Sequence, residues 1–294
     1  MANLKEIRNR ITSVGSTMQI TSAMKMVSAA KLKRAQDAII QMRPYAAKMH
    51  DILTGLSGSL DMSENIFASK REIKNVLMIA ISSNRGLCGG FNNNVIKETL
   101  RQIREEYTSK NISVLTVGKK ATDSFKRTEY TISGSDIPSS ADKLWTELNF
   151  ANASAVAEKV LEAYKSAQID KVVLVYNSFK NVATQIVRAD QLLPVLPPPP
   201  PAAGSKVNLD YIFQPSKEEI VSELIPKSLK IHFYRALLES QAGEHGARMT
   251  AMHKATDNAS DLKKRLTLEY NKARQAAITN EILEIVGGAE ALKG

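Results

Sequence analysis

The chain has 294 residues, which is enough for one globular domain together with a long helical element. Its single cysteine, Cys88, excludes an internal disulfide and fits a reducing compartment. The longest wholly apolar runs, such as residues 76–81, are far too short to span a bilayer.

The net charge of +10 is unevenly distributed along the chain. Residues 1–50 hold nine Lys/Arg and two Asp/Glu, residues 225–294 hold eleven and eight, and the residues between hold equal numbers of each sign. Lys31, Lys33 and Arg34, close to Lys25, form the densest basic cluster. This charge fits a solvated helix face, an acidic protein partner or nucleic acid.

The first segment, residues 3–57, is predicted to form one long helix. Asn3 and Glu6 are spaced as a capping box at its start, and Pro44 is expected to kink or locally open it. Apolar residues recur at alternating steps of three and four, which is the pattern of a coiled-coil seam. They are Leu4, Ile7, Ile11, Val14 and Met18, and then Leu32, Ala35, Ile39, Met42, Ala46, Met49, Leu53, Leu56 and Leu60.

The middle of the chain alternates strands with helices, which is typical of an α/β layer domain. The first expected strand is continuously apolar, as in a buried parallel sheet, and the last alternates, as in an edge strand antiparallel to the third. The expected strands are residues 76–82, 112–117, 171–177 and 182–193, and the expected helices are residues 91–107, 119–125 and 150–167.

The last long segment, residues 228–286, contains no proline and repeats small and apolar residues at helical spacing. A short helix is expected before it, opened by a capping box of Ser216 and Glu219 and ended or kinked by Pro226. Two terminal helices of similar period most simply pack antiparallel.

The sequence therefore predicts an α/β fold plus a long antiparallel coiled coil, formed by the N- and C-terminal helices around an inserted Rossmann-like α/β domain. The expected segments are an N-terminal coiled-coil helix over residues 1–60, the α/β domain over 75–195, a Pro-rich linker over 196–215 and a C-terminal coiled-coil helix over 216–294.

A Gly-rich loop at residues 82–90 joins the first strand to the following helix, where backbone N–H groups can cradle a phosphate. It lacks the Lys-Ser/Thr of a P-loop and the spacing of G-x-G-x-x-G, so tight strand–helix packing is the simpler interpretation. His245 and His253 lie eight residues apart, too far to share a metal unaided, and no G-x-S-x-G nucleophile elbow is present. The absence of a convincing active site favours a mechanical or scaffolding role.

Four motifs in register resemble the gamma subunit of rotary F-type ATP synthases, and the resemblance covers the whole chain. They are Met24–Ala29 (MKMVSA), Ser82–Asn92 (SSNRGLCGGFN), Ala247–Met252 (ARMTAM) with Ala255–Asn258 (ATDN), and Tyr270–Ala276 (YNKARQA) with Ile278–Thr279.

The resemblance implies a non-catalytic central-stalk rotor subunit of a proton-translocating ATP synthase, without a cofactor or metal of its own, that serves ATP synthesis and hydrogen ion transport. Its expected partners are the alpha, beta and epsilon subunits and the membrane-embedded c-ring, and nucleic acid is not among them. Because no signal or transit segment is evident, we expect a bacterial protein that is peripheral to the inner membrane on its cytoplasmic side.

The resemblance also implies specific contacts with the beta subunits. Arg274 and Gln275 match the pair that hydrogen-bonds a beta-subunit loop, the so-called catch. Positions linked to coupling between rotation and catalysis are Met24, Arg248, Thr279, Glu281, Glu284 and Val286. The cations Lys25, Lys31, Lys33 and Arg34 are expected to face an acidic beta-subunit loop.

Two other functions compete with the rotor. A coiled-coil nucleic-acid binder would lose affinity steeply with salt. A nucleotide-dependent enzyme built on the Gly-rich loop would show a saturable ATP or NAD site in calorimetry on the isolated chain.

Overall fold

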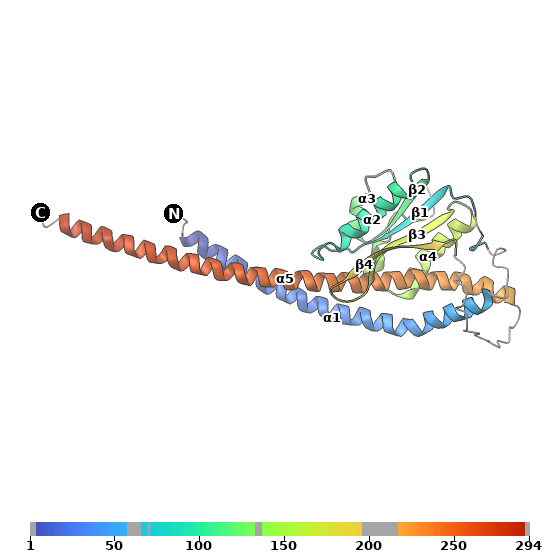
Figure 1. Ribbon diagram of the computed structural model, residues 1–294, viewed down its shortest axis with the longest axis horizontal. Helices are drawn as coiled ribbons and strands as arrows, with labels where there is room; N and C mark the ends of the chain where they lie inside the picture. The colour runs from blue at the N-terminus through green and yellow to red at the C-terminus, as the bar shows by residue number, and fades with distance from the viewer. Residues whose placement is uncertain (1–3, 58–65, 70, 133–136, 196–216, 292–294) are drawn as a thin grey trace. The chain divides into compact units, whose positions relative to one another are not determined.

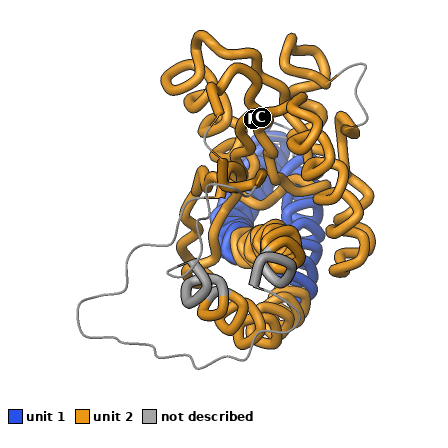
Figure 2. The backbone as a smooth tube through the Cα atoms, turned by 90° about the vertical axis from the view of Figure 1, so that its right-hand side faces the viewer, with its two compact units in different colours: residues 1–28, 248–294 blue, residues 29–247 orange. Residues whose placement is uncertain are grey.

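The computed structural model describes residues 4–57, 66–69, 71–132, 137–195 and 217–291. The chain divides into two compact units, shown in different colours in Figure 2. We call residues 1–28 with 248–294 the helical unit, and residues 29–247 the sheet unit. The expected Asn3 cap, the Ser216 cap and the Pro-rich linker lie outside the described residues.

The sheet unit is built on a four-stranded sheet (Figure 1). Its strands are β1 (Asn75–Ile81), β2 (Asn111–Val117), β3 (Lys171–Phe179) and β4 (Gln185–Leu193), in the spatial order β2-β1-β3-β4. β1 pairs in parallel with β2 and β3, while β4 returns antiparallel to β3, as predicted. β4 begins later than predicted because the Asn181 side chain accepts hydrogen bonds from the backbone N–H of Ala183 and Thr184, which closes a turn there.

Helices cover both faces of this sheet, which explains why β1 is apolar without alternation. Val76, Met78 and Ala80 of β1 pack with α2 (Phe91–Glu105) and α3 (Lys119–Phe125). Leu77 and Ile79 of β1 point to the other face, where they pack with α4 (Phe150–Lys165) and the first part of α5.

The last helix, α5, runs without interruption from Lys217 to Ala291. The prediction of a separate short helix that ends at Pro226 is therefore wrong. A proline inside a helix costs about 3 kcal/mol. Ile225 and Leu229, on either side of it, are buried in the core of the sheet unit, and fully burying two such side chains offsets roughly that amount.

The part of α5 within the sheet unit is an integral part of its core. Ile225, Leu229, Phe233 and Leu237 all belong to the buried cluster beneath the sheet. The sequence predicts a coiled-coil helix for this stretch and gives no indication that the helix covers a sheet face. The first helix, α1 (Leu4–Ser57), continues through Pro44, and its Ile52 packs against the same cluster.

Within the helical unit, the beginning of α1 and the end of α5 lie side by side and antiparallel. Arg8 contacts Tyr270, Thr21 contacts Thr256, and Lys25 contacts His253. The residue numbers on α5 decrease as those on α1 increase, which is the order expected for antiparallel helices. The fold class predicted from the sequence, two long terminal helices around an α/β domain with antiparallel helix pairing, is confirmed.

Candidate interaction surfaces

The Gly-rich loop after β1 is held together by its own polar side chains. Asn92, in the first turn of α2, accepts a hydrogen bond from the backbone N–H of Ser83 (2.9 Å) and donates one to Sγ of buried Cys88 (3.2 Å). Asn84 accepts from the backbone N–H of Lys119 (2.9 Å) at the start of α3. Gly89 takes a left-handed conformation (φ 60°), which a glycine adopts without strain. These bonds use the loop's polar groups to join β1, α2 and α3.

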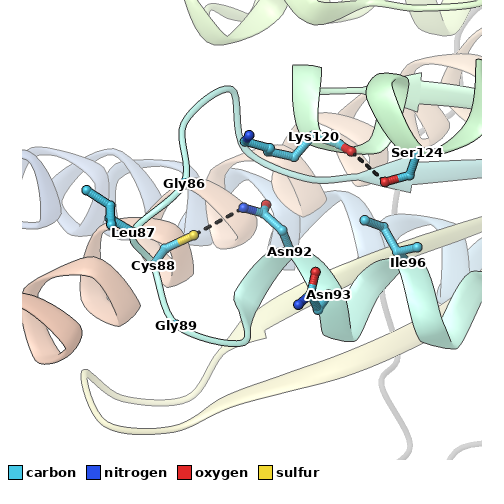
Figure 3. A pocket seen from close by; sticks show the side chains of 9 residues that line it. All are labelled: Gly86, Leu87, Cys88, Gly89, Asn92, Asn93, Ile96, Lys120 and Ser124. Atoms are coloured by element: carbon cyan, nitrogen blue, oxygen red, sulfur yellow. Dashed lines mark hydrogen bonds between the residues drawn. The ribbon is translucent and has the colours of Figure 1, made fainter.

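A pocket of about 250 Å³ lies beside this loop (Figure 3). Lys120 and Ser124 of α3 line it, and the Ser124 hydroxyl is already used in a hydrogen bond to the backbone carbonyl of Lys120 (3.0 Å). Sites for small ligands and cofactors are commonly about 300–1,000 Å³. The pocket is thus smaller than a typical nucleotide site, and the geometry favours packing over phosphate binding.

In the described part of the chain, no three His, Cys, Asp or Glu side chains gather closely enough to hold a metal ion. None of the helices in that part combines the length and the hydropathy that a bilayer span requires.

The seam between α1 and α5 in the helical unit contains buried polar residues. Thr21 is only 8% exposed, and its hydroxyl lies 2.8 Å from that of Thr256. Ser28 is also buried and donates to the carbonyl of Met24. The sequence does indicate their place in the seam, because Thr21, Lys25 and Ser28 continue the three- and four-residue spacing that the apolar residues of α1 follow up to Met18. A polar pair in such a seam favours one register over its neighbours.

Met24 and Lys25, two of the predicted contact residues, are both half-buried on α1. Nζ of Lys25 lies 3.3 Å from Nδ1 of His253 on α5, and the same ring nitrogen lies 3.6 Å from a carboxylate oxygen of Asp257. Lys25 therefore already has a partner within the chain, which the sequence did not indicate.

The three cations of the basic cluster belong to the sheet unit, and all are exposed on α1. Lys33 makes an ion pair with Asp37 one turn later (2.9 Å), while no ion pair is found for Lys31 or Arg34 among the described residues. An exposed pair at this spacing contributes only about 0.3–0.5 kcal/mol, so Lys33 is readily released to another acidic group.

Arg248 differs from the other predicted contact residues because it is buried, with 7% of its surface exposed. A buried guanidinium retains its charge and requires polar neighbours.

The remaining predicted residues lie close together along the end of α5. Arg274, Gln275, Thr279, Glu281, Glu284 and Val286 are all exposed. The Thr279 hydroxyl donates to the carbonyl of Gln275 (2.9 Å) within the helix. Large apolar side chains are exposed in the same stretch: Leu268, Ile278, Ile282, Leu283, Ile285 and Val286. Such a concentration of exposed apolar groups marks an interaction surface.

Comparison with known proteins identifies the class to which this architecture belongs. The family model described as ATP synthase matches residues 3–292. The chain is 57% identical over 297 residues to the ATP synthase gamma chain of Christiangramia forsetii, and 56% identical over 295 residues to that of Flavobacterium johnsoniae. Each alignment covers 100% of both chains.

Solved structures show the same architecture. A chain from a structure of the central stalk and c-ring of the Tetrahymena thermophila mitochondrial ATP synthase is 25% identical, with a TM-score of 0.56 over 80% of this chain and 99% of that chain. A chain from the Euglena gracilis mitochondrial ATP synthase is 21% identical, with a TM-score of 0.62 over 98% of this chain and 94% of that chain, and it supports the fold alone.

The chain therefore belongs to the ATP synthase gamma-chain family. The resemblance stated from the motifs is confirmed, and so is the expected function, a non-catalytic central-stalk rotor subunit of an ATP synthase.

Proposed function

We propose that this chain turns together with a membrane-embedded c-ring and transmits that torque to a ring of alpha and beta subunits. The observation that carries this proposal is the exposed apolar end of α5 in a member of the gamma-chain family. Residues 278–291 are exposed throughout, including Val286 at 52%. A surrounding sleeve of alpha and beta subunits would cover these side chains.

The basic residues supply contacts of a second kind. Lys31 and Arg34 are exposed cations, and Lys25 and Lys33 hold only solvent-accessible partners. An acidic beta-subunit loop would attract these charges without the deep packing that resists sliding. Arg274 and Gln275 would hydrogen-bond another beta-subunit loop, with Met24, Arg248, Thr279, Glu281 and Glu284 in the same set of coupling positions.

Rotation then acts on catalysis through differences between the faces of the rotor. An effector shifts a conformational equilibrium only by its differential interaction energy with the two states. α5 presents basic, acidic and apolar side chains at different points around its exposed end, so each beta subunit would meet a different surface. Successive faces would thus favour different nucleotide-binding states in turn.

The α/β domain would serve the other end of the assembly. This domain, over residues 75–195, and the nearby helix ends would contact the c-ring and the epsilon subunit. The coupling ion would be the proton, and the assembly would lie on the cytoplasmic side of a bacterial inner membrane. This chain would be a peripheral component there.

The test is reconstitution with alpha, beta and epsilon subunits, purified through a tag on beta. We expect one copy of this chain for three copies of beta. In that complex, the double variant Arg274→Ala, Gln275→Ala should lower ATP turnover by at least about tenfold, because a hydrogen bond to a charged group contributes about 1.5–3 kcal/mol.

Lys264→Ala provides a matched control for this variant. Lys264 is an exposed cation on the same helix, and its ion pair with Asp261 is long (3.6 Å). The ATP turnover of a complex that carries Lys264→Ala should equal that of the parent complex. Absence of the chain from the purified complex would refute the rotor assignment, and unchanged turnover of the double variant would refute the catch assignment.

A further inference from the structure

Arg8 and Tyr270 make the most specific side-chain contact described between the two helices of the helical unit. Nη2 of Arg8 donates to the Tyr270 hydroxyl at 2.7 Å. The guanidinium carbon of the same arginine lies 5.6 Å from the centroid of the tyrosine ring. A hydrogen bond and a cation–π contact together define both the distance and the direction between the two side chains.

The position of this contact along α5 gives it a role. Tyr270 lies one helical turn before Arg274 and Gln275, both of which are exposed. On the same stretch, the half-buried residues are Ala273 and Ala277, whose single methyl groups do little to fix how the helix is rotated about its axis. The large, directional contact at Tyr270 is therefore well placed to fix that rotation.

Small rotations matter for a side chain that must reach a partner. The side chains of a helix extend about 5–6 Å from its axis. A rotation of about 20° displaces such a side chain by roughly 2 Å, which is enough to break a hydrogen bond.

We propose that Arg8 and Tyr270 form a positioning pair that orients Arg274 and Gln275 toward the beta subunit. This inference rests on the proposed function, because it assumes that Arg274 and Gln275 contact that subunit. Arg8 acts through the orientation of α5.

The first experiment measures orientation directly, without turnover. A nitroxide is attached at Ile278→Cys, one turn beyond Arg274, in a Cys88→Ser background, and its mobility is recorded by electron paramagnetic resonance in the full chain. Arg8→Ala should increase the mobility. Tyr270→Phe keeps the ring but removes the hydroxyl, so it should give an intermediate increase, and Lys264→Ala should give none. Unchanged mobility in Arg8→Ala would overturn the positioning pair.

The second experiment is a double-mutant cycle on ATP turnover in the reconstituted complex. Arg8→Ala should lower turnover about three- to tenfold in the parent, less than the loss of the direct contacts, because Arg8 acts only through the orientation of α5. Combined with Arg274→Ala and Gln275→Ala, it should lower turnover no further. Arg8→Lys keeps the charge over the ring and should recover part of the loss.

The outcomes separate this inference from the function on which it rests. An equal loss from Arg8→Ala in both backgrounds means that Arg8 acts independently of Arg274 and Gln275, which overturns the pair but leaves the catch intact. The double variant at 274 and 275 could instead leave turnover unchanged while the mobility of the label still responds to Arg8→Ala. In that case the catch assignment is refuted, and the positioning role that depends on it is refuted as well.

Discussion

Two regions of the same helix are built for different surroundings. In the first part of α5, Ile225, Phe233 and Leu237 are buried in the core of the sheet unit. In the last part, Leu283 and Ile285 are as apolar but lie exposed. Helical periodicity therefore indicates which faces of a helix are buried, but it does not indicate whether the surface that buries them belongs to the same chain. The first region is stabilised by burial within this chain, whereas the second would be covered only in the proposed assembly.

The largest effect expected from this difference comes from truncating matched leucines. Leu237 is 0% exposed and Leu283 is 62% exposed, on the same helix. Leu237→Ala should lower the free energy of unfolding by about 2–5 kcal/mol, because it removes buried methyl groups and leaves a cavity. Leu283→Ala should change it by less than about 0.5 kcal/mol. Urea unfolding of the full chain measures both.

A similar loss from both leucine variants would remove the distinction between the two regions. It would mean that the end of α5 is covered by this chain itself, and the case for an external sleeve would lose its main support.

Several elements of the sheet unit were predictable because their causes are local. The apolar run of β1 required cover on both faces, and the turn closed by Asn181 after β3 shifted the start of the edge strand by only a few residues. The antiparallel pairing of the terminal helices followed from the matching periods of Ile7–Met18 and of the end of α5.

The less predictable features depend on contacts between distant segments. The cost of Pro226 is local and visible in the sequence, whereas the burial of Ile225 and Leu229 that offsets it is not. For the candidate site, exposure of Arg274 and Gln275 agrees with a contact role, but Arg248 is buried and Lys25 has His253 beside it. No sequence pattern specifies which polar residues meet across a seam, so the contact between Arg8 and Tyr270 could not be predicted from the sequence.

Glycines offer a second matched pair within α5. A Cβ added at Gly243 would lie 3.3 Å from Cε2 of Phe91 and 3.4 Å from Cγ of Gln185, whereas one added at Gly287 would meet nothing within 4 Å. Gly243→Met should therefore cost about 1–3 kcal/mol through overpacking against the sheet unit. Gly287→Met should be neutral or stabilise the helix by up to about 1 kcal/mol, since glycine is a poor helix former.

The thermal unfolding midpoint of each full-length glycine variant sharpens the comparison, because both changes add the same side chain to the same helix. If Gly243→Met were as stable as Gly287→Met, the close approach of α5 to Phe91 and β4 would have to be looser than the distances indicate.

The smallest expected effect is a pH dependence confined to the covered part of α5. His232 lies there, with Asp190 of β4 and Arg235 and Glu239 of α5 as the charged groups around it. Burial is the main cause that lowers the pKa of His232 below its ordinary value of 6.5, and Arg235 lowers it further while Asp190 opposes the shift. The folded chain thus binds fewer protons at this site than the unfolded chain.

The sign of the pH effect follows from that difference in proton binding. The contribution of His232 to stability is fully present above its unfolded pKa and is lost as the pH falls through the lower folded pKa, with a slope of at most about 1.4 kcal/mol per pH unit. Urea unfolding between about pH 7.5 and pH 5.5 should show a shallower decline for His232→Gln than for the parent. If His232→Gln kept the parental slope, protonation of His232 would not lower the free energy of unfolding. The polar contacts between α5 and the sheet, including the hydrogen bond of 2.7 Å from the Ser178 hydroxyl to Glu239, would then have to accommodate a charged imidazole without loss of stability.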